Sequence, residues 1–171
     1  MKTAGIILIL FSGTGLGLCK SMELSARLKI LEKLVQLLLL LKGEIRCTGA
    51  SLEDAFLDIA AKVPGEYRAF MEETAVRLQK RSGISFGIIF RESALKNLPL
   101  QKISEEEREC FLSLGEKLGY LDREMQVAQL TLLEEELNHR IKVLKNNMPK
   151  QQKTYQSMGI LGGMLLAILL W

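Results

Sequence analysis

The chain has 171 residues, of which 25% are charged and 48% are hydrophobic, and its net charge is +3. Lys and Arg alternate with Asp and Glu through the middle of the chain instead of forming a basic face, which disfavours a nucleic-acid-binding protein. Three widely separated cysteines and a single histidine match no zinc spacing, so we expect no metal and no cofactor.

The two ends of the chain are apolar. Segments 3–19 and 154–171 contain no Asp, Glu, Lys or Arg, and each approaches the roughly 17 to 25 residues that span a bilayer. Basic residues are denser on the inner flanks of these segments than on the outer flanks, which offer only Lys2. The inner basic residues are Lys20, Arg27, Lys29, Lys33, Lys142, Lys145, Lys150 and Lys153. The positive-inside rule therefore predicts transmembrane segments at 1–20 and 154–171, a cytoplasmic domain at 21–153, and both termini outside.

A cleaved signal peptide is the alternative interpretation of the N-terminal segment, because one Lys followed by an apolar run is also a secretory pattern. The residues before Cys19 or Ser21 do not form a small-x-small cleavage site. Leu18 also stands where a lipoprotein box requires a small residue. We therefore favour an anchor.

The middle domain shows helical periodicity almost throughout, and no segment alternates as a strand. Leucines recur at three- and four-residue steps in the first of six expected helices, and turn residues separate the others. The expected helices run over 21–42, from 51 to the Pro-Gly turn at 64–65, from about 66 to 83, over 85–96, over 104–119, and over 122–148. We expect an all-α fold, a six-helix cytoplasmic bundle flanked by N- and C-terminal transmembrane helices.

Several residues are expected to cap these helices. Ser51 is expected to cap the second helix, and Ser104 with Glu107 forms a capping box at the start of the fifth helix. Gly119 is expected to end that helix, and Asp122 to begin the last one.

No group of residues predicts catalysis. The glycine-rich stretch at 13–17 lies in an apolar segment and lacks the Lys-Ser/Thr of a phosphate-binding loop. His139 lies in a charged helical stretch, where a solvated side chain explains it. We therefore expect a protein that is not an enzyme.

Three stretches resemble the stage III sporulation protein AB family of endospore-forming bacteria, itself similar to the F-type platform proteins of type II secretion and type IV pilus machines. The first is Leu-Lys-Gly-Glu-Ile at 41–45 with Ser-Leu-Glu-Asp-Ala-Phe at 51–56, the second is 114–126, and the third is 153–163. Gln156 departs from the pattern, because we expect Arg there. The resemblance covers the whole chain, including the two apolar ends.

The resemblance implies a non-enzymatic membrane component of the channel complex that links mother cell and forespore during engulfment. Its partners would be a cytoplasmic sporulation ATPase, the stage III sporulation protein AA, other membrane components of the complex, and membrane lipid. Its place would be the outer forespore membrane on the mother-cell side. A homo-oligomeric membrane scaffold and a small-ligand sensor are the alternatives.

The candidates for partner binding are two polar residues in the matched stretches and the acidic first turn of the fifth helix. They are Glu44, Glu105, Glu106, Glu107 and Gln126. Glu44 and Gln126 could equally form a buried polar link between helices, because polar residues in bundles often fix register. For Gly119 and Asp122 we favour the capping role over direct contact with a partner.

Overall fold

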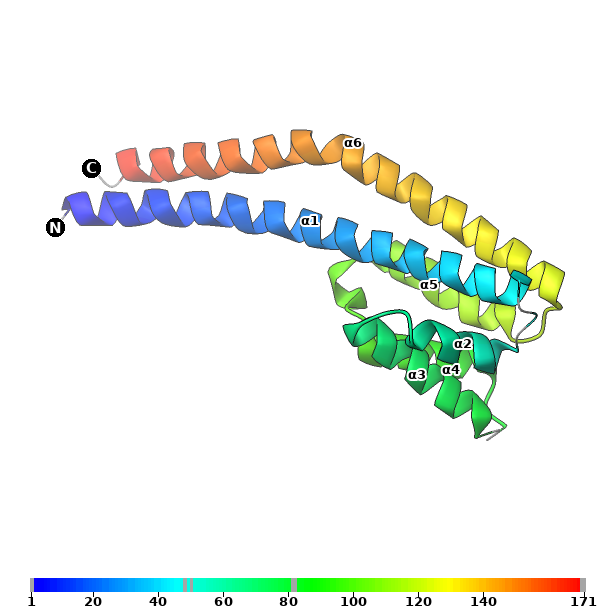
Figure 1. The fold of residues 1–171 in the computed structure, drawn as a ribbon. Helices are drawn as coiled ribbons and strands as arrows, with labels where there is room; N and C mark the ends of the chain where they lie inside the picture. The colour runs from blue at the N-terminus through cyan, green and yellow to red at the C-terminus, as the bar shows by residue number, and fades with distance from the viewer. Residues whose placement is uncertain (1, 48, 50, 81–82, 170–171) are drawn as a thin grey trace. The chain divides into compact units, whose positions relative to one another are not determined.

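The computed structural model describes residues 2–47, 49, 51–80 and 83–169, with side chains only between residues 20 and 149 and at Thr154 and Ser157. Every regular element in this part of the chain is helical, and no strand occurs in it (Figure 1). The elements are α1 (Lys2–Cys47), α2 (Leu52–Ala60), α3 (Gly65–Gln79), α4 (Phe86–Asn97), the 3-10 turn η1 (Leu100–Lys102), α5 (Glu105–Leu118) and α6 (Arg123–Leu169). The expected all-α class with six α-helices is confirmed.

The helices form two compact units. The anchor unit contains α1 up to Lys29 and α6 from Ile141, and the helical domain contains residues 30–140. Within the anchor unit the two helices run side by side, and the start of α1 lies near the end of α6 (Figure 1).

The membrane assignment depends on the two apolar segments. No helix among the residues that could be searched is both long enough and apolar enough to cross a membrane. Apart from Thr154 and Ser157, the side chains of segments 3–19 and 154–171 lie outside the described part of the chain. The transmembrane segments at 1–20 and 154–171, and the domain boundaries at 21 and 153, therefore stay predictions.

Five phenylalanines form the centre of the helical domain. Phe56 on α2, Phe70 on α3, Phe86 and Phe90 on α4, and Phe111 on α5 make ring contacts with centroids 5.4 to 6.4 Å apart. The ring planes of Phe56, Phe70 and Phe90 are close to perpendicular to one another. This is the edge-to-face geometry that aromatic quadrupoles favour. This cluster ties four consecutive helices together.

Glycines let α4 and α5 approach each other closely. A Cβ placed on Gly115 would lie 2.7 Å from Cβ of Phe90, and one on Gly119 would lie 2.9 Å from Cβ of Phe86. In the opposite direction, a Cβ on Gly87 would lie 3.1 Å from Cα of Glu116. The two helices therefore interlock, with glycine on each facing the other.

Two details of the first and last helices differ from expectation. α1 ends at Cys47 instead of residue 42, because Ile45, which is 1% exposed, continues the buried stripe of Leu38 and Leu41. The apolar spacing of Met125, Leu130, Leu133 and Leu137 in the last helix predicts that Met125 points inward, but this side chain is 50% exposed. It lies five residues before Leu130, about 140° around the helix, and so is not on the buried face.

The short turn η1 was not expected. It follows α4 immediately after Pro99, and Leu100 within it is 1% exposed. Only three residues long, it leaves no periodic pattern in the sequence by which it could have been found.

We expect Gly115→Ala to destabilise the helical domain by about 1 to 3 kcal/mol, because an added methyl group would overlap Phe90 inside the core. Chemical unfolding followed by circular dichroism would measure the loss.

Gly43→Ala is the matched control. Gly43 also lies inside a helix, but a Cβ there meets nothing within 4 Å. The change should raise stability by roughly 0.5 to 1 kcal/mol, since Ala favours helix more than Gly. Equal stability of the two variants would contradict the close approach of α4 and α5.

Candidate partner-binding site

The fifth helix begins with a complete capping box. The Ser104 hydroxyl accepts the backbone N–H of Glu107, and the Glu107 carboxylate accepts the backbone N–H of Ser104 at 2.9 Å. This reciprocal pair satisfies two of the donors that a helix start leaves open. Glu107 was also a candidate for partner binding, but it is only 1% exposed, so its carboxylate caps the helix and is not presented to a partner.

Two of the expected acidic candidates do lie at the surface. The side chains of Glu105 and Glu106 are 70% and 84% exposed. Glu105 pairs with Arg108 one turn on, and Glu106 lies 3.4 Å from a guanidinium nitrogen of Arg140 on α6. We call Glu105 and Glu106 the acidic edge. Exposed pairs of this kind contribute little to stability, so these carboxylates can exchange partners at low cost.

Arg140 connects the acidic edge to the half-buried thiol of Cys110. It donates to Glu136 at 2.8 Å, and the Glu136 carboxylate in turn faces Cys110 on α5. The hydrogen bonds from Arg140 and then from Cys110 lower the pKa of Glu136. Burial, followed by the hydrogen bond to Glu136, raises the pKa of the Cys110 thiol to about 11. The thiol therefore stays protonated at neutral pH and is a poor nucleophile.

Glu44 lies inside α1 and not in the loop after it. Its carboxylate, 12% exposed, forms an ion pair with Lys62, which follows α2. The hydrogen bond to Glu44 is the main cause that raises the pKa of Lys62. Glu44 is thus engaged in a link between α1 and the end of α2, one of the two roles that the sequence left open.

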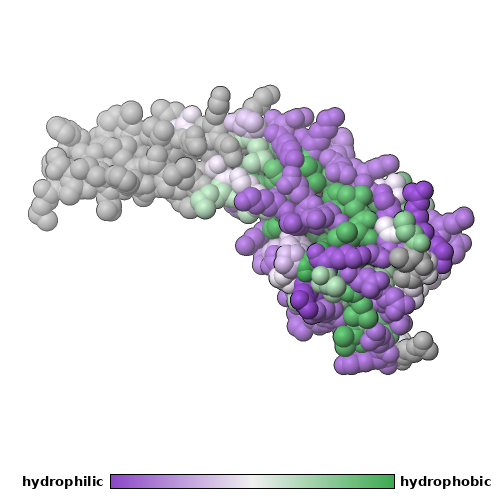
Figure 2. All heavy atoms as spheres, in the orientation of Figure 1, coloured by the Kyte–Doolittle hydropathy of each residue, from purple (hydrophilic) through white to green (hydrophobic). Residues whose placement is uncertain are grey.

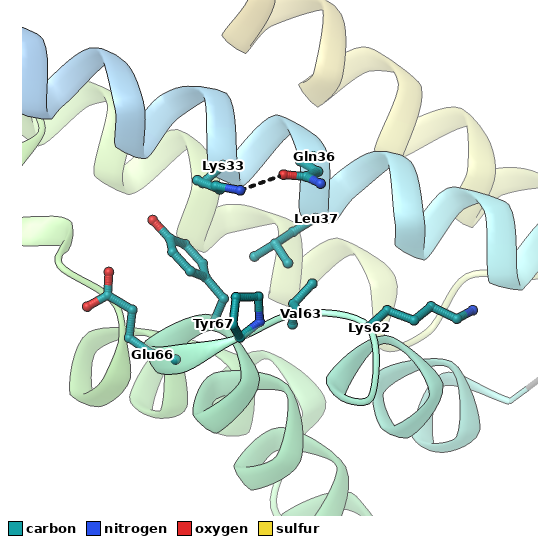
Figure 3. A pocket seen from close by; sticks show the side chains of 9 residues that line it. Lys33, Gln36, Leu37, Lys62, Val63, Glu66 and Tyr67 are labelled. Atoms are coloured by element: carbon teal, nitrogen blue, oxygen red, sulfur yellow. Dashed lines mark hydrogen bonds between the residues drawn. The ribbon is translucent and has the colours of Figure 1, made fainter.

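Lys62 also borders an open pocket of about 400 Å³, drawn in Figure 3. Its wall is apolar at Leu37 of α1 and at Val63 of the loop after α2, and the ring of Tyr67 from α3 rises towards α1 (Figure 3). Lys33 donates to Gln36 at 3.0 Å on the α1 wall that also carries Leu37 (Figure 3). Burial, together with the charge of Glu66, raises the pKa of Tyr67 to about 12, so the phenol stays neutral and can donate a hydrogen bond.

No simple pattern in the sequence indicated this pocket. Its walls come from α1, from the loop after α2 and from the start of α3, and they meet only after folding. The one local signal is the Pro64-Gly65 turn, where Gly65 has a φ of 65° that favours glycine.

The remaining candidates organise the turn between α5 and α6. The Gln126 side chain donates to the carbonyl of Leu118 at 3.0 Å, and a carboxylate oxygen of Asp122 accepts the backbone N–H of Met125 at 2.9 Å. Gly119 follows α5 with φ of −69°, so it is not a left-handed cap. Its importance comes from the close approach of Phe86. Ser51 accepts the backbone N–H of Asp54 at the start of α2.

The described residues contain no cluster of His, Cys, Asp and Glu that could hold a metal ion. His139 is exposed on α6. The arrangement offers surfaces for binding: an acidic edge on α5 and a pocket beside α1.

Comparisons with known proteins agree with each other. The family model described as stage III sporulation protein AB matches residues 2–171. A solved structure titled stage III sporulation protein AB is similar in fold, with a TM-score of 0.60 and 23% identity over 74% of this chain and 96% of that chain. No curated protein matches the chain.

We expect Cys110 to react with a maleimide at about pH 8 at least tenfold more slowly than the exposed Cys47, because Cys110 is half-buried and its thiolate is scarce. Peptide mapping after timed labelling would measure both rates. Glu136→Gln should speed labelling of Cys110 by lowering its pKa, whereas Glu135→Gln on the adjacent exposed position should not.

The same raised pKa sets the sign of a pH effect. The unfolded thiol releases its proton near pH 9, before the folded one does. The contribution of Cys110 to stability is therefore complete below about pH 9 and is lost as the pH rises towards 11. Equal reactivity of Cys47 and Cys110 would contradict this environment.

Proposed function

Because the chain belongs to the stage III sporulation protein AB family, we propose that it is a non-enzymatic membrane platform of the channel complex between mother cell and forespore. In this role it docks the cytoplasmic secretion-type ATPase known as stage III sporulation protein AA. The membership itself supports a role in sporulation. The finer role rests on the resemblance to secretion platforms and on the character of the helical domain.

The observation that best supports docking is the acidic edge on α5. Glu105 and Glu106 are held at the start of a helix whose capping box fixes their backbone, yet their carboxylates remain exposed. Charges at the rim of an interface steer association and set its specificity without holding the fold together. A basic patch on the ATPase is the complementary surface.

We place the chain in the outer forespore membrane on the mother-cell side, with the helical domain in the cytoplasm. The apolar ends and the basic residues on their inner flanks support this topology. The side-by-side course of α1 and α6 in the anchor unit is compatible with two neighbouring spans whose outer ends lie on one side of the membrane (Figure 1).

A small-ligand sensor is the second candidate, and the pocket beside α1 favours it. Its volume of about 400 Å³ lies within the range of ligand sites, and its walls are largely apolar. Convergent polar groups are few, however, since Lys33 already bonds Gln36 and Lys62 already pairs with Glu44. The platform role therefore has the stronger support.

The topology can be tested on the native Cys47, which is exposed on α1. A membrane-impermeant maleimide added to intact cells should leave Cys47 unlabelled, and the same reagent should label it after permeabilisation, because the domain faces the cytoplasm. Peptide mapping distinguishes Cys47 from the other cysteines. Labelling of Cys47 in intact cells would overturn the orientation.

The docking role predicts that Glu105→Lys combined with Glu106→Lys weakens binding of the ATPase roughly tenfold or more, while the helical content is retained. Titration of the purified full chain in detergent with the purified ATPase would measure the affinity. The reason is charge reversal at the steering surface.

A matched control carries the same change in net charge elsewhere. Glu124→Lys with Glu135→Lys alters two exposed residues of α6 that form no ion pair within 4 Å with any other described residue. This variant should bind like the wild type. An unchanged affinity of the Glu105/Glu106 variant would remove the acidic edge from the interface, and hydrolytic or transferase activity of the chain alone would refute the platform role.

A further inference from the structure

A second open groove lies between the start of α4 and the end of α5. It has a volume of about 530 Å³ and is separate from the pocket beside α1. Its lining residues are Ser85, Phe86, Gly87, Ile88, Arg91, Glu116, Gly119 and Tyr120. The groove follows the crossing at which glycines allow the two helices to interlock.

Large apolar side chains are exposed along this groove. Tyr120 is 78% exposed and Ile88 is 51% exposed, and Ile84, one residue before the groove, is 44% exposed. Figure 2 shows hydrophobic side chains at the surface of the face it draws, between hydrophilic ones. Single exposed apolar residues are common, but several around one hollow are typical of an interaction surface. Tyr in particular is enriched at protein interfaces.

Each helix contributes one charge of opposite sign to the groove. The Arg91 guanidinium bonds both carboxylate oxygens of Glu109, at 3.0 and 2.9 Å, and its other N–H groups can bond a further carboxylate. The Glu116 carboxylate is exposed, and no ion pair within 4 Å involves it among the described residues. The groove thus offers one cation and one anion beside an apolar hollow.

A surface with this pattern complements itself. In a two-fold dimer the same patch is used by both copies, so each group meets its counterpart twice. Within one chain the charge of Glu116 already acts on Arg91 from a distance. A two-fold axis through the groove would let Arg91 of each copy pair with Glu116 of the other and would set Tyr120 of each over the partner's hollow. A different protein would need a surface of its own with a matching apolar and charged pattern, whereas a second copy of this chain already has one.

We propose that the groove between α4 and α5 binds a second copy of this chain, forming a two-fold dimer with Tyr120 seated in the partner's groove and Arg91 paired with Glu116 across the axis. This interface is distinct from the acidic edge on α5 and does not depend on docking of an ATPase. The groove is small, so we expect a concentration-dependent equilibrium between monomer and dimer.

The dimer can be tested with the full chain in detergent by sedimentation equilibrium over a concentration series. Ile88→Glu and Tyr120→Glu should each weaken self-association by about tenfold or more, because a charge is placed against an apolar surface. Leu95→Glu is the matched control. Leu95 lies on the same helix with a similar exposure of 48%, does not line the groove, and should leave the dimer unchanged.

Exchanging the charges of Arg91 and Glu116 between two variants tests the proposed pair directly. Glu116→Arg alone sets Arg against Arg across the axis, and Arg91→Glu alone sets Glu against Glu, so each variant should self-associate about tenfold more weakly. A mixture of the two variants, one carrying a fluorophore, should form heterodimers near wild-type affinity, because both cross-axis pairs are then attractive.

Circular dichroism verifies that each variant retains its helical content. A wild-type chain that remains monomeric up to its solubility limit overturns the proposal. So does failure of the mixed variants to associate, or an equal loss with Leu95→Glu. A dimer that is insensitive to every groove variant assigns self-association to another surface and likewise overturns it.

Discussion

The packing of α4 against α5 depends on glycine at three positions, and the centre of the helical domain is built on that contact. Gly115 and Gly119 leave room for Phe90 and Phe86, and Gly87 leaves room for the backbone at Glu116. The two phenylalanines can then reach Phe56 on α2 and their neighbours on α3 and α5. A methyl group on α5 would push the helices apart and would loosen rings on four elements at once.

The acidic side chains of the domain differ in how far they are buried. Glu73 binds both Lys96 and Asn97, and the bond from Asn97 is the main cause of its lowered pKa, so this carboxylate fastens α3 to α4. Glu107 is likewise committed to a cap. Glu105 and Glu106 project into solvent, which leaves them available to a partner. Neighbouring acids in one helical turn therefore differ in what they contact because they differ in burial.

Much of this fold can be predicted from the sequence because the signals are local. Ser51 and Ser104 start helices through contacts within one turn, and leucine spacing identifies α1 and the buried face of α6. The reach of α1 to Cys47 and the burial of Glu107 could not be predicted, because each depends on which helix covers that face. The pocket beside α1 and the groove at α4 and α5 are formed by segments distant in the chain. The spacing of apolar residues within one helix therefore does not predict them.

The order of contacts along the chain has a consequence for synthesis. α2 packs on α3, α3 on α4 and α4 on α5, so each helix finds a neighbour soon after it emerges from the ribosome. The ion pair between Lys42 and Glu134 is different, because 92 positions separate its partners. α1 emerges first but receives this contact only when α6 has been made. The contact that ties α1 to α6 therefore forms late in synthesis, after the helices between them have been made.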